Sequence, residues 1–285
     1  MSAVLEMAIV LISAIIGFVI IIRTLLGNRY QKELWRTFSK VAQKFDLRVI
    51  HSSNIVSNYP DIYGQIDNRK IYLHPAKKKR GRKSRPAKTV FGVEHGIRIE
   101  DNVLITRKST ETKNDNLMDL HVDKLKKYKL KVQSGSKLNE NVIDDMIDNE
   151  VARKINDLIE ESGDNFRALI IESGLLMFST FGFEEEEDVI DEYIEKLYEI
   201  TVKMEENLGE VEDVYNERFV QLDQRNYAIP IKYGIDISLI LIGAYLIYSS
   251  FSDLSFIFLN IGVVIVLVAL VRIYSLSSLL FISRR

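Results

Sequence analysis

Long uncharged runs of apolar residues lie at both ends of the chain. Residues 7–22 carry no charge, and the apolar pattern extends to residues 3–5 and 24–26. A helix of about 20 residues, rising about 1.5 Å per residue, crosses a hydrocarbon core of about 30 Å. A cleavable signal peptide would need a basic stretch before the run, but the only early charge is Glu6. We therefore interpret residues 1–27 as an uncleaved transmembrane anchor.

Two further uncharged runs, residues 237–252 and 254–271, follow one another near the C-terminus. Only Asp253 separates them, so the connection is short and an antiparallel helical hairpin over residues 234–285, ending in a short tail, is favoured. Because lipid offers no hydrogen bonds to the backbone, helices are the expected structure. A re-entrant pair that does not cross the membrane is the alternative. Residues 211–233 are expected to form a helical stalk or linker before the hairpin.

The positions of Lys and Arg around these segments predict their orientation, because cytoplasmic flanks are enriched in both residues. Basic residues follow the first segment, precede the second and follow the third, whereas the opposite flanks hold only Glu6 and Asp253. The sequence therefore predicts a multi-pass protein of the cell membrane. Its N-terminus lies outside, and its central domain and C-terminus lie in the cytoplasm.

Between the membrane segments, the pattern changes from helical to strand-like and back. Apolar residues in residues 30–45 recur at helical spacing and predict an amphipathic helix. Short alternating runs then predict strands, including a hairpin that turns at Asn68-Arg69 and another centred on Gly174. The predicted strands are residues 47–50, 61–67, 70–75, 89–94, 97–100, 102–106, 129–133, 167–173 and 175–181.

Two helices surround the last predicted hairpin, over residues 142–162 and from residue 188 onwards. The expected fold class is therefore an α+β cytoplasmic domain (helix, β-meander, then an αββα unit) on an all-α transmembrane part of three helices. We expect a basic α+β subdomain over residues 28–136 and an acidic αββα subdomain over residues 137–210.

Charge divides these two parts, although the whole chain of 285 residues has a net charge of only −2. Residues 27–136 hold 25 Lys and Arg against 11 Asp and Glu, whereas residues 137–231 hold 8 against 26. The chain contains no cysteine, which excludes disulfides, Cys-ligated metal sites and a thiol nucleophile.

Recognisable catalytic chemistry is absent from the sequence. Phosphate-binding glycine motifs, zinc-protease motifs and the serine-hydrolase elbow do not occur, and the four histidines lack metal-ligand spacing. The acidic clusters at residues 144–150 and 184–188 are explained as a solvated helix face and as carboxylates at a helix N-terminus. We predict no enzyme activity, no catalytic residues, no metal and no cofactor.

A basic segment between two predicted strands has the strongest functional potential. Gly81, Ser84 and Pro86 within it disfavour regular structure. Three partners could neutralise it: anionic lipid headgroups, nucleic acid, or an acidic protein surface of this chain, of another copy or of a partner. No aromatic residue interleaves the cations, which disfavours base stacking and hence nucleic acid. The predicted anion-binding residues are Lys77, Lys78, Lys79, Arg80, Arg82, Lys83, Arg85 and Lys88.

These observations favour a non-enzymatic integral membrane protein that presents an interaction domain, as a scaffold or as a subunit of a membrane complex. The expected partners are membrane lipids, including anionic headgroups, and a protein partner or second copy. A transporter or channel subunit is the first alternative, supported by Asp236 and Asn260 within the apolar runs. A membrane-tethered nucleic-acid-binding protein and a membrane-tethered enzyme of unfamiliar type are the others. We expect the fold to survive deletion of the basic segment.

Overall fold

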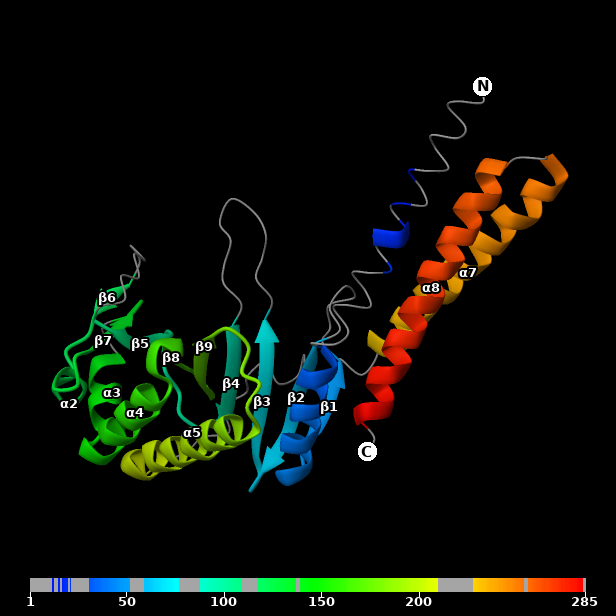
Figure 1. Cartoon of the computed structure of the whole chain (residues 1–285). Coiled ribbons are helices and arrows are strands. Elements are labelled where there is room, and N and C mark those ends of the chain that lie inside the picture. Colours follow the sequence, from blue (N-terminus) through cyan, green and yellow to red (C-terminus); the bar gives the residue numbers. More distant parts are fainter. Residues whose placement is uncertain are drawn as a thin grey trace. The chain divides into compact units, whose positions relative to one another are not determined.

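The computed structural model describes residues 12, 15, 17–19, 21, 31–51, 59–76, 88–108, 117–136, 139–209, 228–253 and 256–283 (Figure 1). The chain divides into two compact units, which we describe separately. The sheet unit comprises Lys40–Ile50 and Pro60–Gln224. The hairpin unit comprises Met1–Ser39, His51–Tyr59 and Arg225–Arg285.

A nine-stranded sheet forms the centre of the sheet unit, with strand order β1-β2-β3-β4-β9-β8-β5-β7-β6. Each pair of neighbours from β2 to β6 runs antiparallel. The strands are β1 Arg48–His51, β2 Pro60–Ile66, β3 Arg69–Ala76, β4 Lys88–Glu94, β5 Val103–Arg107, β6 Met118–Asp119, β7 Leu130–Ser134, β8 Phe166–Glu172 and β9 Leu175–Phe181. The α+β class predicted from the sequence is confirmed, with an antiparallel sheet.

Strands of the predicted basic and acidic subdomains interleave in this sheet. The β8–β9 hairpin of the acidic segment lies between β4 and β5 of the basic segment, with Phe91 of β4 opposite Phe178 of β9. Residues 28–136 and 137–210 therefore build one continuous sheet. The physical reason is apolar matching between β4 and β9, which are far apart in the sequence and both largely buried.

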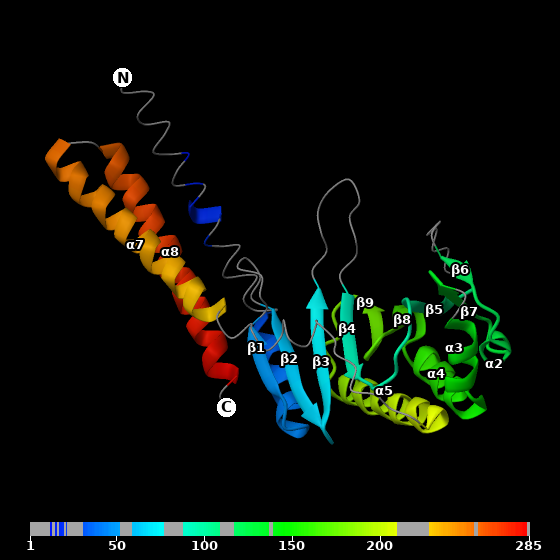
Figure 2. The same ribbon diagram turned by 180° about the vertical axis from the view of Figure 1, so that it is seen from behind.

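The helices of the sheet unit are α2 Asp123–Lys126, α3 Asn139–Met146, α4 Asn149–Glu161 and α5 Glu187–Leu208, with a short 3₁₀ turn over Gly163–Asn165. An earlier helix over residues 31–44 runs from the hairpin unit into the sheet unit. Figures 1 and 2 show α3, α4 and α5 on one face of the sheet. There Tyr193 of α5 meets Phe91 and Phe178 edge-on, with ring centroids 5.4 and 5.1 Å apart.

Three local predictions need correction. The first hairpin turns at Asp67-Asn68 rather than Asn68-Arg69, because Ile66 pairs with Arg69 and both turn residues adopt positive φ (46° and 68°). The predicted helix over residues 142–162 is two helices, because Asp148 caps a new one by accepting a hydrogen bond from the Val151 amide (2.7 Å). Residues 97–100 are not a strand, because they belong to the connection between β4 and β5, strands that the β9–β8 pair separates.

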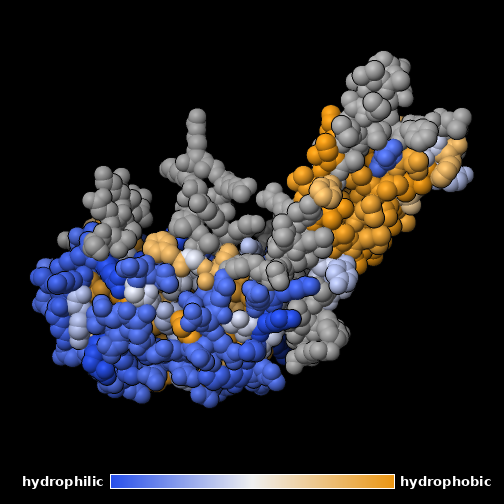
Figure 3. Space-filling view, viewed as in Figure 1, coloured by the Kyte–Doolittle hydropathy of each residue, from blue (hydrophilic) through white to orange (hydrophobic). Residues whose placement is uncertain are grey.

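Two long helices, α7 Ala228–Asp253 and α8 Phe256–Ser283, dominate the described part of the hairpin unit. Within them, Lys232–Phe251 and Phe258–Ser275 are long and apolar enough to cross a membrane. Figure 3 shows the apolar colouring over this pair, in contrast to the hydrophilic surface of the sheet unit. The described residues thus contain two candidate membrane helices rather than the three expected.

The remaining predicted membrane segment falls largely outside the described residues. Of residues 1–27 the structure describes six, and these are helical. Gly17 is buried there, and a Cβ on it would lie 2.7 Å from Cγ1 of Val264 in α8. The predicted stalk over residues 211–233 is described only from residue 228, where α7 already begins.

Close backbone contact between α7 and α8 depends on two glycines. A Cβ added to Gly243 would lie 2.9 Å from the Gly262 carbonyl oxygen, and one added to Gly262 would lie 2.6 Å from the Gly243 carbonyl oxygen. Small residues at such crossings allow helices in lipid to approach and pack. These glycines therefore set the distance between the two helices.

Replacing Gly243 by leucine should force the two helices apart and lower the thermal unfolding temperature of the detergent-solubilised protein by several degrees. Gly234→Leu is the matched control, because a Cβ at Gly234, in the same helix, meets no atom within 4 Å. Scanning fluorimetry measures both. Equal effects of the two substitutions would contradict the proposed role of the glycine contact.

Candidate functional site

The predicted basic segment joins two strand ends that pair with each other. Ala76, the last residue of β3, lies opposite Lys88, the first residue of β4. Lys88 is partly buried, and the other predicted anion-binding residues lie outside the described part of the chain. These are Lys77, Lys78, Lys79, Arg80, Arg82, Lys83 and Arg85. Their binding role therefore stays a prediction.

An aspartate–histidine pair lies on the same face of the sheet as Lys88, close to these strand ends. Asp61 of β2 and His74 of β3 face each other across the strands, since Ile62 pairs with Leu73. The Asp61 carboxylate is buried, and its Oδ1 lies 2.7 Å from Nδ1 of the partly exposed His74 ring. The buried carboxylate fixes the orientation of the imidazole, so the other ring nitrogen faces away from it.

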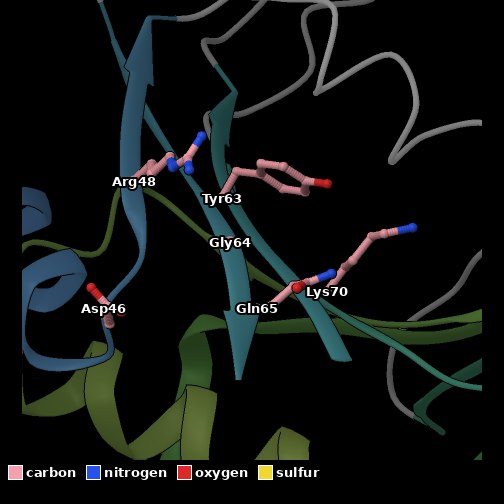
Figure 4. Close-up of a pocket in the computed structure, with 6 residues that line it drawn as sticks. All are labelled: Asp46, Arg48, Tyr63, Gly64, Gln65 and Lys70. Atoms are coloured by element: carbon pink, nitrogen blue, oxygen red, sulfur yellow. The ribbon is translucent and has the colours of Figure 1, made fainter. Parts of the chain in front are cut away.

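A polar cavity of about 400 Å³ opens further along these strands, where β1 begins beside β2. In Figure 4 the side chains of Arg48, Tyr63, Gln65 and Lys70 project to one side of the strands, while Asp46 lies apart at the start of β1. Gly64 completes the lining. The alternation of side chains along β2 and β3 explains why these groups share a face.

Glu94 holds one wall of this cavity in place. Its Oε1 lies 3.2 Å from the Lys70 ammonium, and its Oε2 accepts a hydrogen bond from the Lys70 amide (3.1 Å). Arg48, by contrast, forms no ion pair with any other residue that the structure describes. The amino-acid sequence alone does not predict this cavity, because its lining comes from two chain segments whose pairing no local pattern reveals.

Several acidic residues of α5 form ion pairs within the fold. Along α5, Glu187 and Asp191 pair with Lys40 and Lys44 of the helix over residues 31–44, at 2.9 and 2.6 Å. This spacing of four residues on both helices makes a ladder of opposite charges. Among the described residues, no three His, Asp or Glu side chains gather into a group that could hold a metal ion.

A buried polar cluster connects the C-terminal end of α5 to the sheet. The Glu205 carboxylate pairs with the Arg69 guanidinium (2.5 Å) and accepts a hydrogen bond from the Gly96 amide (2.7 Å). Beside it, Nδ1 of the buried His95 accepts a hydrogen bond from the Ile97 amide (3.0 Å), which requires a neutral ring protonated on Nε2. Burial lowers the pKa of His95 to about 4, against the opposing influence of Glu205.

In the hairpin unit, polar side chains of α7 and α8 also form an ion pair and a hydrogen bond. The Asp236 carboxylate lies 3.0 Å from the Arg272 guanidinium, and the Tyr233 and Ser277 hydroxyls hydrogen-bond at 2.9 Å. Both contacts join the first part of α7 to the last part of α8. Asp236, which supports the transporter or channel alternative, is thus paired across the hairpin.

Comparison with known proteins gives no family. No protein-family model matches the sequence, and no curated protein matches it. Among solved structures, the chain is similar to the crystal structure of the mycobacterial trehalose monomycolate transport factor A, TtfA, with 11% sequence identity and a TM-score of 0.42. The match covers 60% of this chain and 94% of that chain. A likeness this weak says nothing about the function of this chain.

The buried neutral His95 should make stability depend on pH. Its pKa in the folded state (about 4) lies below the ordinary value of 6.5, so the unfolded chain takes up the proton first as the pH falls. We expect the free energy of unfolding to fall between pH 6.5 and about 4, by about 3 kcal/mol at most. His95→Gln keeps an acceptor for the Ile97 amide. It should remove this fall in the free energy of unfolding with decreasing pH.

The measurement is urea unfolding of the full chain in detergent at several pH values. His121→Gln is the control, because His121 is exposed. His121→Gln should keep the pH dependence of the free energy of unfolding. If His95→Gln keeps it as well, His95 is not its cause.

Proposed function

We propose that this protein is a multi-pass integral membrane protein that holds an α+β interaction domain at the cytoplasmic face of the cell membrane. It acts as a non-enzymatic scaffold or as a subunit of a membrane complex. The observation that carries the proposal is the outward apolar surface of α7 and α8, on which Tyr245, Tyr248 and Phe251 are 69–73% exposed. Such a continuous apolar surface favours lipid or a membrane partner over water.

The contacts within the hairpin support the proposed topology. Asp236 with Arg272 and Tyr233 with Ser277 bring the start of α7 next to the end of α8. If both helices span the bilayer, the residues before α7 and after α8 emerge on the same side. The excess of Lys and Arg on that side supports a cytoplasmic location for it and, with the first segment also spanning the membrane, an N-terminus outside.

The proposed interaction element is the basic segment from Lys77 to Lys88. It contains eight cations and no carboxylate, and the paired residues Ala76 and Lys88 hold its two ends at one edge of the β3–β4 pair. Anionic headgroups are the favoured partner, because a tethered cationic segment gains about 1 kcal/mol per basic residue near an anionic surface. An acidic protein surface and nucleic acid are the competing partners.

The lipid interaction can be tested on the full chain in nanodiscs, with an environment-sensitive dye on Ser84→Cys, the only cysteine in that variant. We expect a blue shift of the dye when phosphatidylglycerol is added to phosphatidylcholine, and its loss at high salt, because the attraction is electrostatic. Replacing the basic residues of the segment by glutamine should abolish the shift.

The matched control neutralises exposed cations elsewhere, by Lys126→Gln, Lys127→Gln and Arg153→Gln, and should keep the shift. Identical spectra with and without phosphatidylglycerol would overturn the lipid proposal. A shift that appears only on addition of RNA would instead assign the segment to nucleic acid.

A further inference from the structure

We propose that the cavity lined by Asp46, Arg48, Tyr63, Gly64, Gln65 and Lys70 binds a phosphate ester with a small polar organic part. This site is separate from the basic segment and does not depend on the proposed function. Its chemistry is that of a soluble phosphomonoester or of the phosphodiester in a lipid headgroup.

The cationic side chains supply the recognition of the phosphate. Arg48 and Lys70 come from β1 and β3 and lie on the same side of the strands (Figure 4). The guanidinium of Arg48 is exposed and forms no ion pair with another described residue, so its fork of donors is available to two phosphate oxygens. The Lys70 ammonium is a second donor at the cavity wall, where its ion pair with the Glu94 carboxylate fixes its position and offsets part of its charge.

The size and remaining lining of the cavity indicate an ester rather than inorganic phosphate. A volume of about 400 Å³ lies in the range of small-molecule sites and exceeds what one phosphate fills. The Gln65 amide has no hydrogen-bond partner among the described residues, and it offers donors and an acceptor to hydroxyl groups. The exposed Asp46, two residues before β1, lies apart from these side chains at the margin of the cavity.

The local backbone fixes the positions of the lining residues. A Cβ on Gly64 would lie 2.7 Å from Cδ2 and 3.1 Å from Cα of the buried Leu47, on the face of β2 opposite Tyr63 and Gln65, so the glycine lets the chain before β1 pass close to β2. Asp46, directly before Leu47, adopts a left-handed conformation with φ of 54°, which turns the chain into β1. The relative positions of Arg48 and the β2 side chains are therefore fixed by the fold.

Other ligand classes fit the cavity less well. A divalent metal prefers several carboxylate ligands, and the lining offers one. An anionic protein segment or a nucleic acid would need a longer surface of cations than this pair. A single phosphate group with hydroxyl-bearing substituents uses both cations and the neutral polar groups together.

The test is isothermal titration of the full chain in detergent with three soluble probes: inorganic phosphate, glycerol 3-phosphate, and glycerophosphoglycerol as the diester headgroup. We expect at least one ester to bind more tightly than inorganic phosphate. Arg48→Gln should weaken that binding about tenfold or more, since a charge-assisted hydrogen bond is lost. Arg98→Gln, at an exposed arginine outside the cavity, should leave it unchanged.

Gln65→Ala provides a second variant at an exposed position. It should weaken binding of the ester without weakening binding of inorganic phosphate. Tighter binding of the diester identifies a lipid headgroup as the source, and tighter binding of the monoester identifies a soluble metabolite. The proposal is overturned if no ester binds, if inorganic phosphate binds as tightly as both esters, or if Arg48→Gln binds like the unaltered protein.

Discussion

The outward apolar surface of α7 and α8 is the constraint on which the organisation of this chain depends. Burying apolar surface is favourable by about 25 cal/mol per Å², and the aromatic side chains on this pair stay largely exposed within the protein. The helices satisfy their own backbone hydrogen bonds, so they suit a bilayer. Glycine contact and the Asp236–Arg272 pair hold them together. The proposed attachment of the sheet unit to one membrane face follows from this hairpin.

Helix α5 organises the sheet unit, and its ion pairs join the oppositely charged parts of the chain. Its apolar face, including Ile194 and Leu197, is buried over the sheet. Three of its acidic residues, Glu187, Asp191 and Glu205, pair with cations of the basic part of the chain, Lys40, Lys44 and Arg69. The two oppositely charged parts therefore neutralise each other in part within one fold.

Hydropathy and periodicity predicted what depends on local sequence: the two C-terminal apolar helices, α5, and most strands. They failed where distant segments decide the structure. Pairing of β4 with β9 depends on side-chain matching across about 90 residues of chain, and the cavity depends on where β1 meets β2. Three local predictions were also wrong: the position of the first hairpin turn, a strand over residues 97–100, and a single helix where Asp148 begins a second one. The charge of the basic segment was evident from the sequence, whereas the face shared by Asp61, His74 and Lys88 required the strand register.

Cysteine labelling of intact cells tests the central claim, the topology around the hairpin, most directly. The chain has no cysteine of its own, so each single substitution reports without background. With a membrane-impermeant maleimide, Ser2→Cys and Ser255→Cys should react in intact cells, whereas Ser84→Cys and Ser283→Cys should react only after permeabilisation. Reaction of Ser84→Cys in intact cells, or labelling of Ser255→Cys only after permeabilisation, would contradict the account.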